Sequence, residues 1–133
     1  MPRFGKKSRE RMRGVDSRLQ NIFNEVIKEF DCTILEGLRT KERQAELVAD
    51  GKSKTMKSRH ITGKALDVVP YIVNWENTDR MTFFAGYVMG IASQVLSEED
   101  FKKFRWGRDW GKDWLKKDKN KTTFLDYPHF EIK

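Results

Sequence analysis

The sequence predicts a single α+β domain, because it contains both segments with helical spacing of apolar residues and short runs typical of strands. At 133 residues the chain has room for one domain, and its 38% hydrophobic content is enough to build a modest core without disulfides. The single cysteine, Cys32, is expected to be a buried structural thiol. We expect residues 15–133 to form the domain and residues 1–14 to form a basic N-terminal arm, loose or lying on the surface.

Three segments have the apolar spacing of helices. In residues 15–30 apolar side chains recur every three or four positions, and Asp16 or Ser17 is available as an N-terminal cap. Residues 41–50 are flanked by a capping threonine and a terminating glycine, which predicts a second helix. Residues 79–96 carry a wide apolar face, so we expect a central buried helix there.

Short apolar or alternating runs predict the strands. These are residues 33–35, 65–69, 104–106 and 129–132. The polar stretch 97–100 is expected to be a break after the third helix, and residues 107–111 are expected to form a turn. The lysine-rich segments 52–59 and 116–121 lack apolar periodicity, so we expect surface loops at both places.

The chain is basic: 27 Lys and Arg residues outnumber 20 Asp and Glu residues, and the formal net charge is +7. Such a charge attracts anionic polymers and surfaces, a class that includes nucleic acid, anionic lipid and bacterial cell wall. No stretch approaches the roughly 20 apolar residues of a membrane span, so no stable membrane insertion is expected. Residues 1–13 lack the apolar run of about 7–15 residues that an export signal needs, so we expect the protein to accumulate in the cytoplasm of the cell that makes it.

The two histidines, His60 and His129, lie in motifs with acidic partners. Alone, His60 would be read as an ordinary hydrogen-bonded histidine. However, Asp67 interrupts an apolar run seven residues later, where an unpaired carboxylate would be costly, and Gly63 allows a turn between them. Two imidazoles and one carboxylate leave the fourth position on zinc open for water, as catalytic sites require. The sequence therefore predicts a metallohydrolase with His60, Asp67 and His129 as metal ligands.

Other polar residues are candidates for the reaction itself. Asp126, three residues before His129, is a candidate general base and acid, with a turn-forming aspartate as the alternative. Arg39, at the end of a predicted strand, is a candidate to hold a substrate carboxylate or an oxyanion, or else a surface arginine. Ser58 either donates a hydrogen bond near the metal or begins a turn, and Glu131 either orients a histidine or faces solvent.

Four tryptophans, Trp75, Trp106, Trp110 and Trp114, accompany the basic residues. Aromatic side chains near cations can stack on bases or sugars, but they more often form core or pocket walls. Trp106 and Trp110 lie on either side of residues 107–109, at the start of the predicted turn, so we expect them to line a cleft. Trp110 is the candidate for a substrate contact.

Four stretches together match a known family. Residues 58–67 have the pattern S-x-H-x-x-G-x-A-x-D, and residues 126–129 have the pattern D-x-x-H. With Glu-Gly-Leu-Arg-Thr at 36–40 and Arg-Trp-Gly-x-Asp-Trp at 105–110, the chain resembles zinc peptidases that include D-Ala-D-Ala carboxypeptidases and L-alanyl-D-glutamate endopeptidases. The resemblance implies the Hedgehog/DD-peptidase fold, an α+β fold in which helices flank a small antiparallel sheet.

The resemblance also implies roles for the site residues. His60, Asp67 and His129 would bind Zn²⁺, Asp126 would be the catalytic acid and base, and Arg39 would contact the substrate or the oxyanion. Carboxypeptidase members often carry Glu where this chain has Asp126, whereas phage endopeptidases look more like this sequence. Residues 15–133 would then be one zinc peptidase domain.

The expected protein is an endolysin, a zinc endopeptidase that cleaves the L-Ala–D-Glu bond in the stem peptide of bacterial peptidoglycan. A D-Ala-D-Ala carboxypeptidase is the alternative, followed by a non-catalytic, zinc-stabilised cell-wall-binding module. A basic nucleic-acid-binding protein would explain the charge but not the metal-like motifs, so nucleic acid is not an expected partner. We expect a monomer, made in the host cytoplasm, that reaches the periplasmic wall after the membrane has been permeabilised by a separate phage protein.

Overall fold

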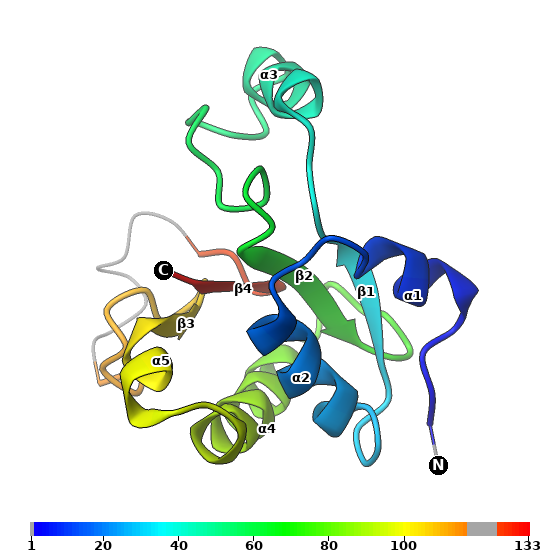
Figure 1. The fold of residues 1–133 in the computed structure, drawn as a ribbon, viewed down its shortest axis with the longest axis vertical. Coiled ribbons are helices and arrows are strands. Elements are labelled where there is room, and N and C mark those ends of the chain that lie inside the picture. Colours follow the sequence, from blue (N-terminus) through cyan, green and yellow to red (C-terminus); the bar gives the residue numbers. More distant parts are fainter. Residues whose placement is uncertain (1, 117–124) are drawn as a thin grey trace.

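The structure, a computed structural model, describes residues 2–116 and 125–133. Figure 1 shows a small sheet with helices packed around it. The elements in chain order are α1 (Lys6–Arg11), α2 (Ser17–Val26), β1 (Cys32–Glu36), α3 (Lys41–Ala49), β2 (Ala65–Pro70), α4 (Thr78–Val95), α5 (Glu98–Lys103), β3 (Phe104–Trp106) and β4 (His129–Ile132). Among the described helices, none combines the length and the apolar character needed to cross a membrane.

The four strands form one antiparallel sheet in the order β1-β2-β4-β3. This confirms the α+β fold with a small antiparallel sheet flanked by helices. The pairing of β2 with β4 places Asp67 directly opposite His129, although the two residues are far apart in the sequence. On the other side of β2, Asp67 pairs with Glu36 of β1. The register of the sheet therefore brings the sequence-predicted ligands together.

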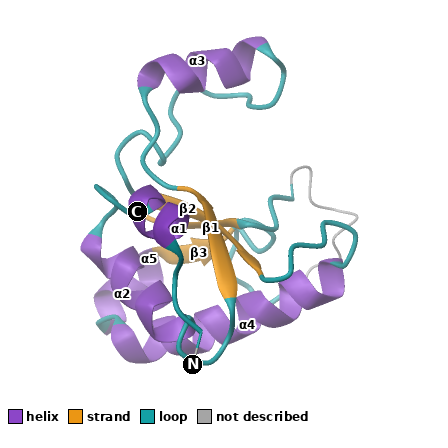
Figure 2. Ribbon diagram, turned by 90° about the vertical axis from the view of Figure 1, so that its right-hand side faces the viewer, coloured by secondary structure: helices purple, strands orange, loops and turns teal. Residues whose placement is uncertain are grey.

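The core lies between the sheet and helices α2 and α4, which lie side by side against it (Figures 1 and 2). Phe130 of β4 is central to this core, because its ring meets Phe23 of α2 edge-on at 5.3 Å and also contacts Phe84 and Phe104. Since side chains alternate along a strand, anchoring Phe130 in the core turns its neighbours His129 and Glu131 to the opposite face. Both of those polar neighbours are buried.

The predicted helices and strands are present with end shifts of a few residues. Asp16 is the cap of α2, since its side chain accepts a hydrogen bond from the backbone N–H of Arg18. Cys32 is buried, as expected. The predicted break after the third helix is shorter than residues 97–100: α4 ends at Val95, Ser97 caps α5, and residues 98–100 are already helical. Three acidic residues in the first turn of α5 and two lysines in its last turn suit the helix dipole, a signal that the sequence carried.

The N-terminal segment is not a loose arm. Helix α1 lies along β1, where Ser8 Oγ accepts from the backbone N–H of Ile34 and Arg11 donates to the carbonyl of the same residue. Phe4, Ser8 and Met12 are all buried at four-residue spacing. This spacing is hard to recognise in the sequence, because mostly charged residues separate the three buried positions. Because β1 is an edge strand, α1 satisfies backbone groups that would otherwise stay open to pairing.

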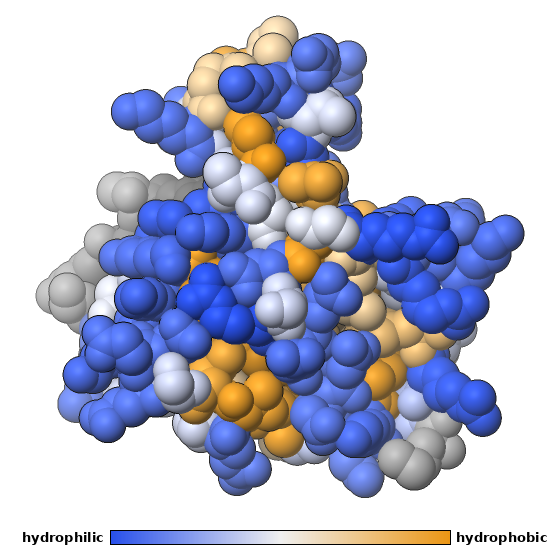
Figure 3. Space-filling view, in the orientation of Figure 1, coloured by the Kyte–Doolittle hydropathy of each residue, from blue (hydrophilic) through white to orange (hydrophobic). Residues whose placement is uncertain are grey.

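Helix α3 and the loop after it stand clear of the sheet (Figures 1 and 2), and hydrophilic side chains cover most of the face seen in Figure 3. Gln44 of α3 is fully buried and donates to Ser53 Oγ and the Thr55 carbonyl, which ties this helix to the loop. The lysine-rich segment 52–59 contains no helix or strand, as expected. The predicted loop at 116–121 lies outside the described residues from position 117 onward.

Gly37 allows the N-terminal segment to approach the end of β1. A Cβ atom built there would lie 2.0 Å from the carbonyl oxygen of Arg11 and 2.9 Å from Val15 Cγ2. We predict that Gly37→Ala lowers the free energy of unfolding by about 1–3 kcal/mol, the usual effect of overpacking. Urea unfolding followed by circular dichroism measures this change.

Gly86 is the matched control, because it is exposed on α4 and a Cβ atom there meets nothing within 4 Å. Gly86→Ala should raise the free energy of unfolding by roughly 0.5–1 kcal/mol through helix propensity. Equal stability of the two variants would contradict the close contact assigned to Gly37.

Candidate metal centre

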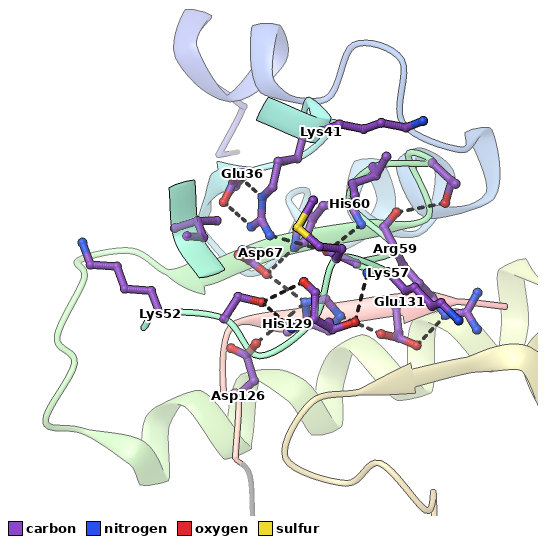
Figure 4. A pocket seen from close by; sticks show the side chains of 18 of the residues that line it. Glu36, Lys41, Lys52, Lys57, Arg59, His60, Asp67, Asp126, His129 and Glu131 are labelled. Carbon is purple, nitrogen blue, oxygen red and sulfur yellow. Dashed lines mark hydrogen bonds and ion pairs between the residues drawn. The ribbon is translucent and has the colours of Figure 1, made fainter. Parts of the chain in front are cut away.

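The three sequence-predicted ligands converge on one point (Figure 4). His60 Nε2 lies 3.1 Å and His129 Nδ1 lies 3.2 Å from the same oxygen of Asp67. One ligand atom from each residue falls within 4.8 Å of the other two, a separation at which all three can hold one metal ion. Both histidines are buried and Asp67 is partly buried.

His60 is held in place through its main chain and its ring. It lies in the loop before β2, where Gly63 has a φ of 73° and makes the turn that the sequence predicted. A Cβ atom at Gly63 would lie 2.6 Å from the carbonyl oxygen of Gly14, so this turn packs on the N-terminal segment. The ring nitrogen Nδ1 of His60 is 2.8 Å from the Gly37 carbonyl oxygen. Both glycines that hold this loop therefore contact residues 11–15.

The partners on the far side of each ring determine which nitrogen carries the proton. The Gly37 carbonyl can only accept, so Nδ1 of His60 donates to it and Nε2 presents a lone pair to Asp67 when the ring is neutral. Likewise, Nε2 of His129 lies 2.8 Å from Glu131 Oε1, which leaves Nδ1 facing Asp67. A carboxylate bound to the far nitrogen of a histidine in this way is the arrangement that orients metal-binding histidines. Of the two alternatives for Glu131, contact with a histidine or exposure to solvent, the structure shows the first, because Glu131 is buried beside His129.

Three acceptors at one point repel each other unless a cation lies between them. A proton supplies that charge in the metal-free site: burial disfavours the charged imidazole, but hydrogen bonds to Asp67 and Glu131 raise the pKa of His129 to about 9. Burial alone would raise the pKa of Asp67, yet His129 and His60 hold it well below its usual range. Burial also opposes ionisation of Glu131, but the bond to His129 lowers its pKa to about 2. The donor set therefore fits a divalent metal ion bound by two imidazoles and a carboxylate.

Asp126 lies at the edge of this centre. Its Oδ2 is 3.9 Å from His129 Nδ1, and its side chain is about one-third exposed. Burial and the negative charge of Asp67 both raise the pKa of Asp126 above its usual value. A carboxyl group of this kind, partly open to the cavity and beside the metal ligands, is placed to exchange protons with a reacting group.

Gly107 fixes the position of Asp126 relative to β4. The backbone N–H of Gly107 donates to the His129 carbonyl and its own carbonyl accepts from the N–H of Asp126, at 2.7 and 2.9 Å. A Cβ atom at this glycine would lie 2.4 Å from the carbonyl oxygen of Asp126. The preceding residue, Trp106, adds a hydrogen bond from its indole N–H to the Tyr127 carbonyl. The turn after β3 thus holds the chain segment that carries Asp126.

Arg39 is engaged with other protein groups. Its guanidinium binds both oxygens of Glu36, at 2.8 and 2.5 Å, and NH1 donates to Gln44 Oε1 and, at 3.4 Å, to Ser58 Oγ. The hydroxyl of Ser58 also accepts from the backbone N–H of His60. Arg39 and Ser58 therefore connect the end of β1, α3 and the His60 loop. A contact of either with substrate stays a prediction.

The centre opens into a cavity of about 920 Å³. It is lined by the ligands and by Glu36, Arg39, Lys41, Leu47, Lys52, Ser53, Thr55, Met56, Lys57, Ser58, Arg59, Ile61, Thr62, Arg105, Trp110, Asp126 and Glu131. Trp110 forms a wall of it, with its ring 5.4 Å from that of His129. The sequence reasoning did not single out Arg59 or Arg105. Arg59 lies near the site because it directly precedes His60 in the sequence. Arg105 lies near it because β3 pairs with β4 and places Arg105 opposite Glu131.

Comparisons with known proteins agree on one family. A sequence model described as phage L-alanyl-D-glutamate peptidase matches residues 1–133. The chain is 30% identical over 138 residues to the L-alanyl-D-glutamate peptidase of Escherichia phage T5, covering 98% of this chain and 97% of that protein. It is 32% identical over 102 residues to the L-alanyl-D-glutamate peptidase of Listeria phage A118, covering 77% of this chain and 30% of that protein.

A solved structure is also similar over nearly the whole chain. The Serratia marcescens L-Ala D-Glu endopeptidase ChiX superimposes with a TM-score of 0.77 at 29% sequence identity. The match covers 99% of this chain and 91% of that one. The arrangement of strands and helices that builds the centre is therefore shared with a peptidase structure.

We predict that a divalent metal ion displaces a proton when it binds. His129 has a pKa of about 9, so it is protonated at neutral pH without metal, and a ligand nitrogen must give up that proton. Titration calorimetry with Zn²⁺ in buffers of different ionisation enthalpy should show release of about one proton, and binding should weaken as the pH falls.

Glu131→Gln is the comparison variant, because it removes one of the two carboxylates whose hydrogen bonds raise the pKa of His129. It should release a smaller fraction of a proton at the same pH. A binding enthalpy that does not depend on the buffer would show that no proton is displaced.

Proposed function

The chain belongs to the phage L-alanyl-D-glutamate peptidase family, and we propose that it is a peptidoglycan endopeptidase that hydrolyses the amide bond between L-Ala and D-Glu in the stem peptide. The observation that carries the proposal is the meeting of His60, Asp67 and His129 beside Asp126 on a fold shared with a peptidase of this specificity. Family membership over the full chain supports both the reaction and the substrate class.

We propose Zn²⁺ as the metal held by His60 Nε2, Asp67 and His129 Nδ1. Two nitrogen donors and one carboxylate are a usual ligand set for catalytic zinc, with Gly37 and Glu131 orienting the two rings. When bound, such an ion acts as a Lewis acid that polarises the scissile carbonyl and lowers the pKa of water.

Asp126 is proposed as the general base and then the general acid. Its carboxylate takes a proton from the attacking water as the water oxygen bonds to the carbonyl carbon. The same proton passes to the leaving nitrogen when the C–N bond breaks, so Asp126 ends the cycle ionised. Its raised pKa suits both steps, because a very acidic carboxyl group would be a poor proton acceptor.

The remaining candidates have supporting roles in this proposal. Arg39 contributes positive charge near the oxyanion while keeping its bonds to Glu36, and Ser58 holds the His60 loop. Trp110 provides an apolar wall for the peptide beside His129. The net charge of +7 favours attraction of the whole protein to the anionic wall polymer.

The proposed setting follows from the family. The chain would act as a monomer on bacterial peptidoglycan, after synthesis in the host cytoplasm and permeabilisation of the membrane. A D-Ala-D-Ala carboxypeptidase has less support, because the similar proteins are named for the L-Ala–D-Glu bond. A non-catalytic wall-binding module would not require a carboxyl group with a raised pKa beside the ligands, as Asp126 is.

We predict that Asp126→Asn binds Zn²⁺ with the wild-type stoichiometry but hydrolyses peptidoglycan at least about 100-fold more slowly, the scale of a lost general base. Release of soluble peptides from purified sacculi measures the rate, and elemental analysis measures the metal. Asp79→Asn, which makes the same chemical change at an exposed residue in the first turn of α4, should keep full activity.

His60→Ala and His129→Ala distinguish the ligands from the base, since each should lose both metal and hydrolysis. An Asp126→Asn variant that hydrolyses normally would remove Asp126 from the mechanism. Stoichiometric zinc in either histidine variant would show that the ligand assignment is wrong.

A further inference from the structure

Two arginines, Arg59 and Arg105, share the carboxylate of Glu131 on the wall of the cavity, and Figure 4 shows Arg59 and Glu131 there. Arg59 Nε lies 2.9 Å from Glu131 Oε2, and Arg105 binds the same oxygen through Nε and NH2 at 3.0 and 2.9 Å. The other oxygen of Glu131 is used by His129. Two guanidinium charges against one carboxylate leave one positive charge uncompensated, next to a metal ligand.

The two arginines differ in how fully their donors are used. The third nitrogen of Arg105, NH1, approaches the Trp110 carbonyl at 3.4 Å, and its guanidinium lies over the Trp110 ring at 5.2 Å. Arg59 uses only Nε, and within residues 2–116 and 125–133 its NH1 and NH2 have no hydrogen-bond acceptor. Its side chain is 36% exposed and lines the cavity.

Arg39, the arginine that the sequence favoured for a substrate carboxylate, differs from Arg59 because its charge is already paired within the protein. Both oxygens of Glu36 neutralise it, and NH1 is engaged by Gln44 and Ser58. Because Glu36 balances its charge and Gln44 and Ser58 occupy NH1, Arg39 is a weaker candidate for binding a free substrate carboxylate than an arginine with unbalanced charge and unused N–H groups. Among the three arginines that line the cavity, the charge that no carboxylate balances therefore belongs to the pair on Glu131, and three lysines also line the wall.

The substrate of the proposed reaction brings a matching group. Glutamate has two carboxyl groups, and only one continues the peptide chain, so the residue that contributes the scissile nitrogen carries a second carboxyl group, which is a free carboxylate unless it is amidated. That charge enters the cavity beside the cleaved bond. Moving it out of water without a partner would be costly, and an arginine fork that binds both oxygens is the usual partner.

Resting on the proposed function, we propose that Arg59 binds the free carboxylate of the D-glutamate residue through NH1 and NH2, while Glu131, itself held by Arg105, positions the Arg59 guanidinium. Glu131 thereby links two tasks: one oxygen orients His129, and the other fixes the anion-binding arginine. The substrate class is a peptide in which the residue after the scissile bond carries a free carboxylate.

The test compares two synthetic stem peptides that differ in one group, the free carboxylate of D-Glu or the corresponding carboxamide. The zinc-loaded wild type should cleave the amide peptide with a kcat/KM lower by about tenfold or more, the scale of a lost charged hydrogen bond. Arg59→Gln should lose a similar factor on the carboxylate peptide, mostly through KM, and should no longer distinguish the two peptides.

Control variants distinguish the effect of the positive charge of Arg59 from the effect of its two-nitrogen geometry, and from the loss of any arginine. Arg59→Lys keeps the charge without the fork and should recover part of the loss. Arg43→Gln removes an exposed arginine on α3 that pairs with Glu46, so it should preserve both the rate and the preference. Zinc content is measured for every variant, because Arg59 reaches His129 through Glu131.

Several results would overturn the inference. Equal cleavage of both peptides by the wild type would show that no group recognises the carboxylate, although the endopeptidase function would stand. An Arg59→Gln variant that keeps the preference would assign recognition elsewhere, and one that loses zinc would assign Arg59 to supporting His129. Failure of the zinc-loaded wild type to cleave either peptide would contradict the proposed function itself and this inference with it.

Discussion

The structure depends on three hydrogen-bond acceptors that meet at one point. Nε2 of His60 and Nδ1 of His129 both face one oxygen of Asp67 because their other ring nitrogens are occupied by Gly37 and Glu131. Such a cluster is stable only with a cation between its members, either a proton or a metal ion. The proposed chemistry follows from that requirement, since two imidazoles and one carboxylate would leave a coordination position on a bound zinc ion for the reaction.

Most of the fold serves to hold this cluster. The β2–β4 register sets Asp67 against His129, and Phe130 anchors β4 in the core. The N-terminal segment covers the edge of β1 and packs on Gly37, whose carbonyl contacts the His60 ring, and on Gly63, in the turn after His60. A segment that looked peripheral in the sequence therefore supports the site, and removing it would expose both an edge strand and the support of a ligand.

Periodicity and spacing predicted the parts of this protein that local physics determines. Helix α4 and the strand around Asp67 follow from apolar patterns, and the three candidate ligands that meet in the structure follow from the histidine motifs. The sequence did not predict α1, because the buried positions in and beside it, Phe4, Ser8 and Met12, are separated by mostly charged residues. It also did not predict the roles of Arg59 and Arg105, since these depend on which residues the sheet places opposite Glu131.

The most direct test of the account is to identify the bond that the zinc-loaded protein cleaves in Gram-negative peptidoglycan, with and without a chelator, by mass spectrometry of the fragments. Chelator-sensitive release of fragments with a new N-terminal D-Glu is the predicted result. Loss of terminal D-Ala alone would make the protein a carboxypeptidase, and intact peptidoglycan despite bound zinc would contradict a catalytic role for the centre.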